Sequence, residues 1–200
     1  MTNSDFEIRA EGDATPGTLV GYAAKFHSRS QDLGGFVEVI APGAFTRSLE
    51  EGHDVRAVIN HDPNLVIGRV SAGTLRLSQD DTGLRYEVDL PNTTAARDLA
   101  ESLKRGDISQ SSFQFRTIED DWSFDTDGRE LRTLYDLELR DVSPVTYPAY
   151  LDTNSEIAKR SLEAARAKRE SAESVSLVDI RAESQKDFDA LSILLTIEEN

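Results

Sequence analysis

The fold class is indicated most directly by residues 74–90, Thr74-Leu75-Arg76-Leu77-Ser78-Gln79-Asp80-Asp81-Thr82-Gly83-Leu84-Arg85-Tyr86-Glu87-Val88-Asp89-Leu90. Polar and apolar residues alternate over 74–78 and again over 84–90, and this period of two is typical of half-buried β-strands. The residues between the two runs, 80–83, are of the types that form turns. The stretch therefore predicts a β-hairpin.

Similar strand patterns occur on both sides of this hairpin. They predict strands over 18–24, 36–40, 108–118 and 131–145, with a polar, turn-rich segment at 119–129 between the last two. We therefore expect a mainly β fold of the α+β class.

Two helices interrupt the predicted strands. Residues 42–51 begin with Pro42 and are followed by Gly52, which suits a short helix. A longer helix is predicted over 94–105, where Thr93 or Thr94 can cap the first turn and Gly106 can end the last. Its apolar stripe consists of Ala96, Leu99, Ala100 and Leu103.

The composition changes near residue 155 and divides the chain into two predicted domains. Residues 1–155 hold all twelve glycines and all six prolines, whereas 156–200 hold neither. In the second part, residues 155–173 predict a helix with few large apolar residues, and 187–197 predict a small amphipathic one. We interpret 156–200 as a helical C-terminal arm, exposed on the protein.

Charge and composition exclude several classes of function. The formal net charge is −15, of which residues 156–200 carry only −3. A domain this acidic will not bind nucleic acid through general phosphate attraction. Without cysteine there is no disulfide, thiol nucleophile or Cys-based zinc site. No apolar run reaches the length of a membrane span, and the N-terminus does not have the pattern of a signal peptide. The expected location is therefore the cytoplasm.

Of the three histidines, His61 is the strongest candidate for chemistry. His27 and His53 lie in predicted loops, where a histidine is ordinarily a solvated surface residue. His61 follows the apolar run 55–59 within Asn60-His61-Asp62-Pro63. The end of a strand fixes the backbone while leaving the imidazole free to face a cleft, although a turn with a hydrogen-bonded histidine explains this fragment equally well.

A serine and a carboxylate could complete the chemistry. On the strand over 108–115, alternation places Ser111 on the face of the two phenylalanines and Ser112 on the opposite, polar face. Near the end of the later strand, Asp141 or Glu138 could orient a histidine. Simple alternation assigns Asp141 to the face of Leu137 and Leu139, and a β-bulge would exchange the faces. Serine, histidine and a carboxylate suffice for acyl transfer, because the histidine activates the hydroxyl.

Five motifs, in order and at compatible separations over about residues 6–155, resemble the HK97-type phage prohead protease family. They are Phe36-Val37-Glu38-Val39-Ile40-Ala41-Pro42-Gly43-Ala44-Phe45, Ile59-Asn60-His61-Asp62-Pro63 with Ile67-Gly68-Arg69, Gly73-Thr74-Leu75-Arg76-Leu77, Gly106-Asp107-Ile108-Ser109 with Ser112-Phe113-Gln114-Phe115, and Asp141-Val142-Ser143-Pro144-Val145-Thr146-Tyr147-Pro148-Ala149-Tyr150.

The resemblance implies a serine endopeptidase that cleaves capsid and scaffolding proteins inside the assembling prohead, in the host cytoplasm. By analogy with the family, Ser112 is the nucleophile, His61 the general base and Asp141 the orienting acid, with Glu138 as the alternative acid. Ser111 remains a second candidate nucleophile, because Gln110-Ser111 stands where family members often have Gly-Met.

The resemblance also implies a fold like that of the herpesvirus assembly proteases, a largely antiparallel β-barrel surrounded by helices. No metal or cofactor is expected. The arm over 156–200 would dock the protease into the scaffold or be removed by self-cleavage, and homo-oligomerisation remains open. Two other classes explain parts of the sequence: a non-catalytic capsid-assembly or scaffolding protein on the same fold, and a carbohydrate- or peptide-binding β-domain.

Overall fold

The computed structural model describes residues 6–9, 16–147 and 160–171. Contacts within the chain divide it into two compact units, Met1–Ser155 and Glu156–Asn200. The roles assigned to these two segments from the sequence stay predictions. The predicted segment over 187–197 lies outside the described residues.

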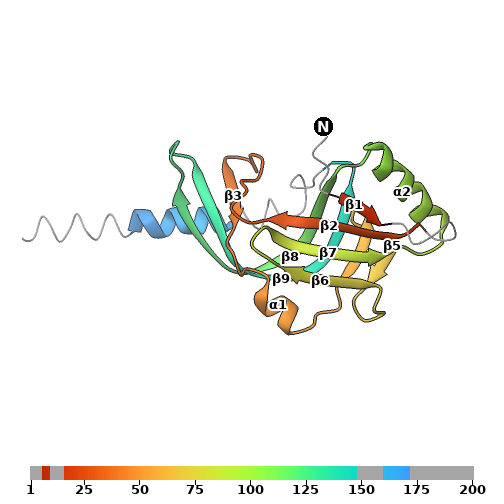
Figure 1. Ribbon diagram of the computed structural model, residues 1–200. Helices are drawn as coiled ribbons and strands as arrows, with labels where there is room; N and C mark the ends of the chain where they lie inside the picture. The colour runs from red at the N-terminus through yellow and green to blue at the C-terminus, as the bar shows by residue number, and fades with distance from the viewer. Residues whose placement is uncertain (1–5, 10–15, 148–159, 172–200) are drawn as a thin grey trace, which may run out of the picture. The chain divides into compact units, whose positions relative to one another are not determined.

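The first sheet has the strand order β1-β2-β7-β6, and all its neighbours are antiparallel (Figure 1). It contains β1 (Phe6–Arg9), β2 (Thr18–Lys25), β6 (Leu75–Gln79) and β7 (Gly83–Asp89). The predicted hairpin is confirmed: β6 pairs with β7, and the N–H of Asp80 donates to the carbonyl of Gly83 across the turn.

The second sheet is organised around one long strand, β9 (Glu130–Val145). Along one side of β9 lies the antiparallel β8 (Gln110–Phe124). Along the other side, β3 (Phe36–Ile40) and β4 (Arg56–Ile59) pair with it in parallel, one after the other. The outer strand β5 (Asp62–Arg69) pairs with β4. The last residues of β4 and β9 therefore lie at the same end of the sheet.

Two short helices are attached to these sheets. The helix α2 (Thr94–Arg105) confirms the prediction: the hydroxyl of Thr93 accepts a hydrogen bond from the N–H of Ala96, and Gly106 is the C-cap. The helix α1 (Thr46–Glu50) is shorter than the predicted 42–51. The left-handed backbone of Gly43, with φ of 86°, cannot continue a right-handed helix, so helical structure begins only after it. Residues 160–171 of the second unit are helical.

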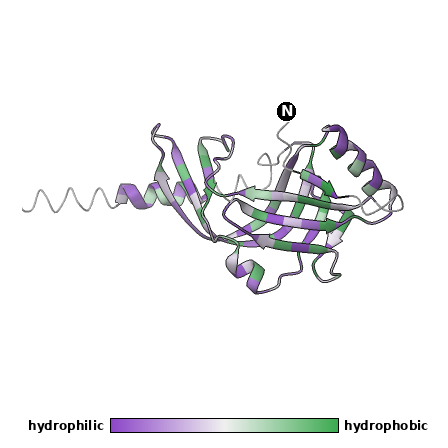
Figure 2. Ribbon diagram, in the orientation of Figure 1, coloured by the Kyte–Doolittle hydropathy of each residue, from purple (hydrophilic) through white to green (hydrophobic). Residues whose placement is uncertain are grey.

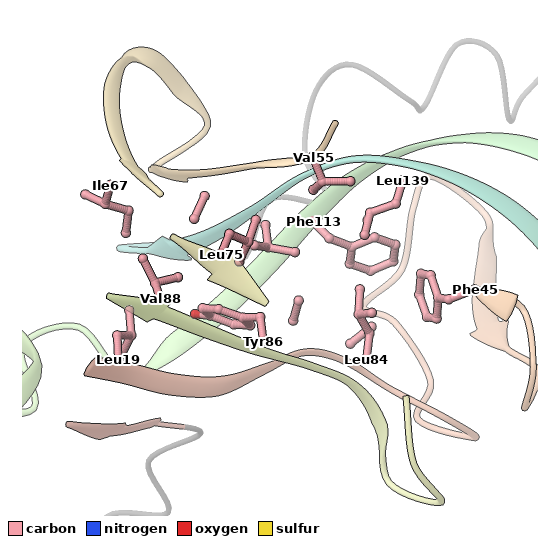
Figure 3. Packing of buried hydrophobic residues seen from close by; sticks show 14 of the residues in the cluster. Leu19, Phe45, Val55, Ile67, Leu75, Leu84, Tyr86, Val88, Phe113 and Leu139 are labelled. Carbon is pink, nitrogen blue, oxygen red and sulfur yellow. The ribbon is translucent and has the colours of Figure 1, made fainter. Parts of the chain in front are cut away.

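One hydrophobic core joins the two sheets (Figure 3). Leu19 and Tyr86 reach it from the first sheet, and Phe113 and Leu139 reach it from the second. Along the strands, hydrophobic and hydrophilic residues alternate as the sequence pattern predicts (Figure 2). The mainly β class is confirmed. The described strands pair within two separate sheets rather than in a closed ring.

The polar segment predicted at 119–129 is mostly strand instead. Strand β8 continues to Phe124, and the connection to β9 is a tight turn over 125–129. Contacts between residues that lie far apart in the sequence stabilise this extension. The rings of Phe36 and Trp122 lie 5.1 Å apart, and the Arg132 guanidinium donates to Asp120. Such tertiary contacts override the weak strand propensity of the segment.

Candidate active site

His61 lies on the two-residue turn that connects β4 to β5. Ile59 pairs with Asp62, so Asn60 and His61 are the central residues of a hairpin loop. Both have left-handed backbones, with φ of 52° and 58°, as a type I′ turn requires. Asparagine is common at such positions, and histidine is tolerated far less readily than glycine. Regular structure resumes at once: Pro63 is the second residue of the edge strand β5, where its missing N–H is harmless.

The last residues of β9, and Thr146 directly after them, hold this turn in place. The N–H of Asn60 donates to the carbonyl of Pro144 at 3.0 Å, and the N–H of Thr146 donates to Oδ1 of Asn60 at 2.8 Å. The N–H of His61 donates to the hydroxyl of Ser143 at 3.2 Å. The backbone that carries the imidazole is therefore fixed against β9.

A β-bulge at Arg140 sets the direction of Asp141. Gln114 pairs with Asp141 and Phe115 pairs with Leu139, so Arg140 has no partner on β8. The extra residue exchanges the two faces of β9. Leu139 and Val142 both face the core, whereas Asp141 faces away from it. Simple alternation along β9 would have placed the carboxylate in the core.

The imidazole and the Asp141 carboxylate are in contact. Nδ1 of His61 lies 2.6 Å from Oδ1 of Asp141, and the side chains are only 12 % and 14 % exposed. An ionised carboxylate only accepts hydrogen bonds, so it favours the tautomer with hydrogen on Nδ1. The lone pair is then on Nε2, which has no hydrogen-bond partner among the described residues. This arrangement leaves Nε2 available as a base.

Ser112 lies on the same face of the sheet as Asp141. Its cross-strand partner is Ser143, and partners in register project to the same side. Its neighbour Ser111 faces the core, where its hydroxyl lies 2.8 Å from the hydroxyl of Tyr86. Ser112 is 5 % exposed and lines a cavity of about 250 Å³ between the start of β8, the end of β2 and residues 28–31.

The structure thus places His61 against Asp141, and Ser143 contacts both of these residues. Ser112 lies directly across the β8–β9 pair from Ser143. No hydrogen bond joins Ser112 to His61 within the described part of the chain, and His61 does not line the cavity. Glu138 is elsewhere: its carboxylate accepts from Nε of Arg116 at 3.0 Å. The Arg116 guanidinium holds the pKa of Glu138 below its ordinary value.

The sequence reasoning missed Ser143 and the structural part of Asn60. A signal for each was present. Asparagine is common at the left-handed positions of a type I′ hairpin turn. Ser143, two residues after Asp141, shares its face on any regular strand.

In residues 6–9, 16–147 and 160–171, no cluster of three or more histidine, aspartate or glutamate side chains could hold a metal ion, and no helix is long and apolar enough to cross a membrane.

Comparison with known proteins gives one family. The family described as caudovirus prohead serine protease matches residues 4–168. The prohead protease of Enterobacteria phage HK97 is 30 % identical over 152 residues, which cover 74 % of this chain and 63 % of that relative. The chain therefore spans less than two thirds of the relative's length. No solved structure matches this chain.

The family match covers most of the chain, including the segments that carry His61, Ser112 and Asp141. The chain belongs to the caudovirus prohead serine protease family.

Proposed function

We propose that this protein is a serine endopeptidase in which Ser112 is the nucleophile, His61 the general base and Asp141 the orienting acid. One observation carries the proposal: a His61–Asp141 pair lies on the face of the β8–β9 ladder that also bears Ser112. The family membership supports protease activity. Glu138 is the weaker candidate for the acid, because its carboxylate binds Arg116.

In the proposed reaction, Nε2 of His61 removes the proton of the Ser112 hydroxyl as Oγ attacks the scissile carbonyl carbon. Protonated His61 then gives this proton to the leaving amine, and water releases the acyl group from Ser112 by the reverse sequence. Asp141 stabilises the imidazolium in both steps. Catalytic hydrogen bonds are often long in a free enzyme. The mechanism requires Ser112 Oγ and His61 Nε2 to reach hydrogen-bond distance when substrate binds.

The proposed substrates are the capsid protein and the scaffolding protein of the same phage, cleaved inside the assembling prohead in the host cytoplasm. The support for this is the name of the relative, a prohead protease. Removal of residues 156–200 by self-cleavage, or their use in docking to the scaffold, belongs to the same proposal. So does a fold of the herpesvirus assembly protease type, supported by two sheets that enclose one core.

The test uses a fluorophosphonate probe, which reacts with activated serines whatever the substrate preference. The intact protein is treated with the probe, and peptide mass spectrometry identifies the modified residue. The proposal predicts modification of Ser112 in the wild type and a large loss of modification in His61→Ala. In parallel, each protein is co-expressed with the capsid protein of the same phage. Capsid processing that persists in both Ser112→Ala and His61→Ala would contradict the proposal, and a wild type that neither reacts nor processes would favour a non-catalytic assembly protein.

A further inference from the structure

We propose that Ser143 and Asn60 are positioning residues that hold His61 against Asp141. The inference rests on the proposed function, in which His61 is the base. Neither residue is proposed to touch the substrate. Together they connect the turn that carries the imidazole to the strand that carries the carboxylate.

The Ser143 hydroxyl completes a ring of three hydrogen bonds. It accepts from the N–H of His61 at 3.2 Å and donates to Oδ1 of Asp141 at 3.4 Å. The same oxygen, Oδ1 of Asp141, lies 2.6 Å from Nδ1 of His61. Oδ1 of Asp141 is thus connected to both parts of His61. It contacts the imidazole directly and reaches the backbone N–H through the Ser143 hydroxyl.

A hydroxyl is suited to this place because it donates and accepts at one atom. Ser143 is 0 % exposed, so burying its hydroxyl would be unfavourable without these two partners. An apolar residue of similar size would fill the space without that penalty. The burial of a serine here is therefore better explained by the position of His61 and Asp141 than by packing.

Asn60 fixes the turn from the other side. Its side chain forms a two-way contact with Thr146: Oδ1 accepts from the N–H at 2.8 Å, and Nδ2 donates to Oγ1 at 3.4 Å. Its own N–H donates to the carbonyl of Pro144. His61 has a left-handed backbone that glycine would adopt more readily, so surrounding contacts must sustain it. Asn60 and Ser143 supply those contacts.

The experiment measures the rate at which the fluorophosphonate probe modifies Ser112, from pH 5 to 9, in the full chain. We expect Ser143→Ala to lower this rate by about 10- to 100-fold, since a small misplacement of a catalytic group has effects of that size. The pH at which the rate reaches half of its plateau should also move, because a hydrogen bond to Asp141 is lost. Asn60→Gly, which keeps the left-handed turn and loses the side-chain contacts, should lower the rate by about tenfold. Asn60→Asp keeps the acceptor for Thr146 and should recover part of the rate.

Thr93→Ala is the matched control, because it also removes one hydroxyl that accepts a backbone N–H, at the start of α2. It should react with the probe at the wild-type rate even where its thermal stability falls. A wild-type rate and pH profile in Ser143→Ala would overturn the inference and leave the proposed function intact. If Ser143→Ala does not fold, a wild-type rate in Asn60→Gly overturns it instead. If Ser112 of the wild type is not modified, the proposed function itself fails.

Discussion

Nδ1 of His61 and Oδ1 of Asp141 lie 2.6 Å apart, although 80 positions separate the two residues in the chain. Two local irregularities produce this contact. A left-handed turn brings the imidazole back over the end of β9, and a bulge at Arg140 turns the carboxylate out of the core. Each irregularity is costly or unusual alone, and backbone strain of this kind is typical of functional sites.

Asp141→Asn should lower the reactivity of Ser112 by about 10³- to 10⁴-fold with little change in stability. The amide keeps the shape of the carboxylate but can donate to Nδ1, which favours the wrong imidazole tautomer. The measurement is the rate of probe modification at pH 7, with a thermal unfolding curve for each protein. Glu138→Gln is the control, since Glu138 binds Arg116 rather than His61. Equal losses in the two variants would contradict the assignment of Asp141.

Ser111→Ala and Ser112→Ala should separate stability from activity. Ser111→Ala removes a hydrogen bond to the buried Tyr86 hydroxyl and should lower the free energy of unfolding by about 1 kcal/mol. It should leave the probe reaction in place. Ser112→Ala should abolish the reaction and unfold like the wild type. Urea unfolding and probe modification of both variants check this, and a reactive Ser112→Ala protein would assign the nucleophile to another residue.

The buried pair of Glu38 and Arg132 should make stability depend on pH. Oε2 of Glu38 lies 3.0 Å from the Arg132 guanidinium. Burial raises the pKa of Glu38 from 4.5 to about 7, against the opposing effect of Arg132. The folded protein therefore binds this proton more tightly than the unfolded chain. The free energy of unfolding should accordingly fall as the pH rises from 4.5 to 7, by about 3 kcal/mol from this group.

Glu38→Gln isolates that effect, because glutamine does not titrate and Arg132 keeps its contacts with Asp120 and Thr117. Urea unfolding at pH 5 and pH 8 gives the difference between wild type and variant at each pH. Relative to Glu38→Gln, the wild type should have a lower free energy of unfolding at pH 8 than at pH 5. A difference that does not change with pH would show that Glu38 stays ionised throughout.

Gly83→Ala should destabilise the first sheet strongly. A Cβ at Gly83 would lie 2.0 Å from the carbonyl oxygen of Ala24 on the neighbouring strand, so the backbone must move. We expect the free energy of unfolding to fall by about 3 kcal/mol. At Gly128, where φ is 76° and no atom lies within 4 Å, alanine should be less harmful, about 1–2 kcal/mol from backbone strain alone. Similar losses at both positions, measured by urea unfolding, would contradict this.

Local patterns predicted the elements that depend on local sequence. The hairpin of β6 and β7 and the helix α2, with Thr93 as one of its two candidate caps, were predicted correctly. Turn residues, alternation and capping lie within a few positions of one another. The bulge at Arg140 could be named only as an alternative, since it depends on the register between β8 and β9. The strand over 119–124 was missed because distant partners, such as Phe36 with Trp122, stabilise it.

The site residues were named from the sequence, yet their neighbourhood required the fold. Motif resemblance selected Ser112, His61 and Asp141 but contained no distance. The contact of Asp141 rather than Glu138 with His61 follows from the pairing of β4 and β8 with β9. The same pairing brings Ser143 of β9 within reach of the His61 N–H.

The most direct test of the account is the fluorophosphonate reaction of the wild-type protein beside His61→Ala, with the modified peptide identified by mass spectrometry. We expect modification at Ser112 alone in the wild type, and a rate at least about 10³-fold lower in His61→Ala. Modification of Ser112 at equal rates in both proteins, or of another serine in the wild type, would contradict it.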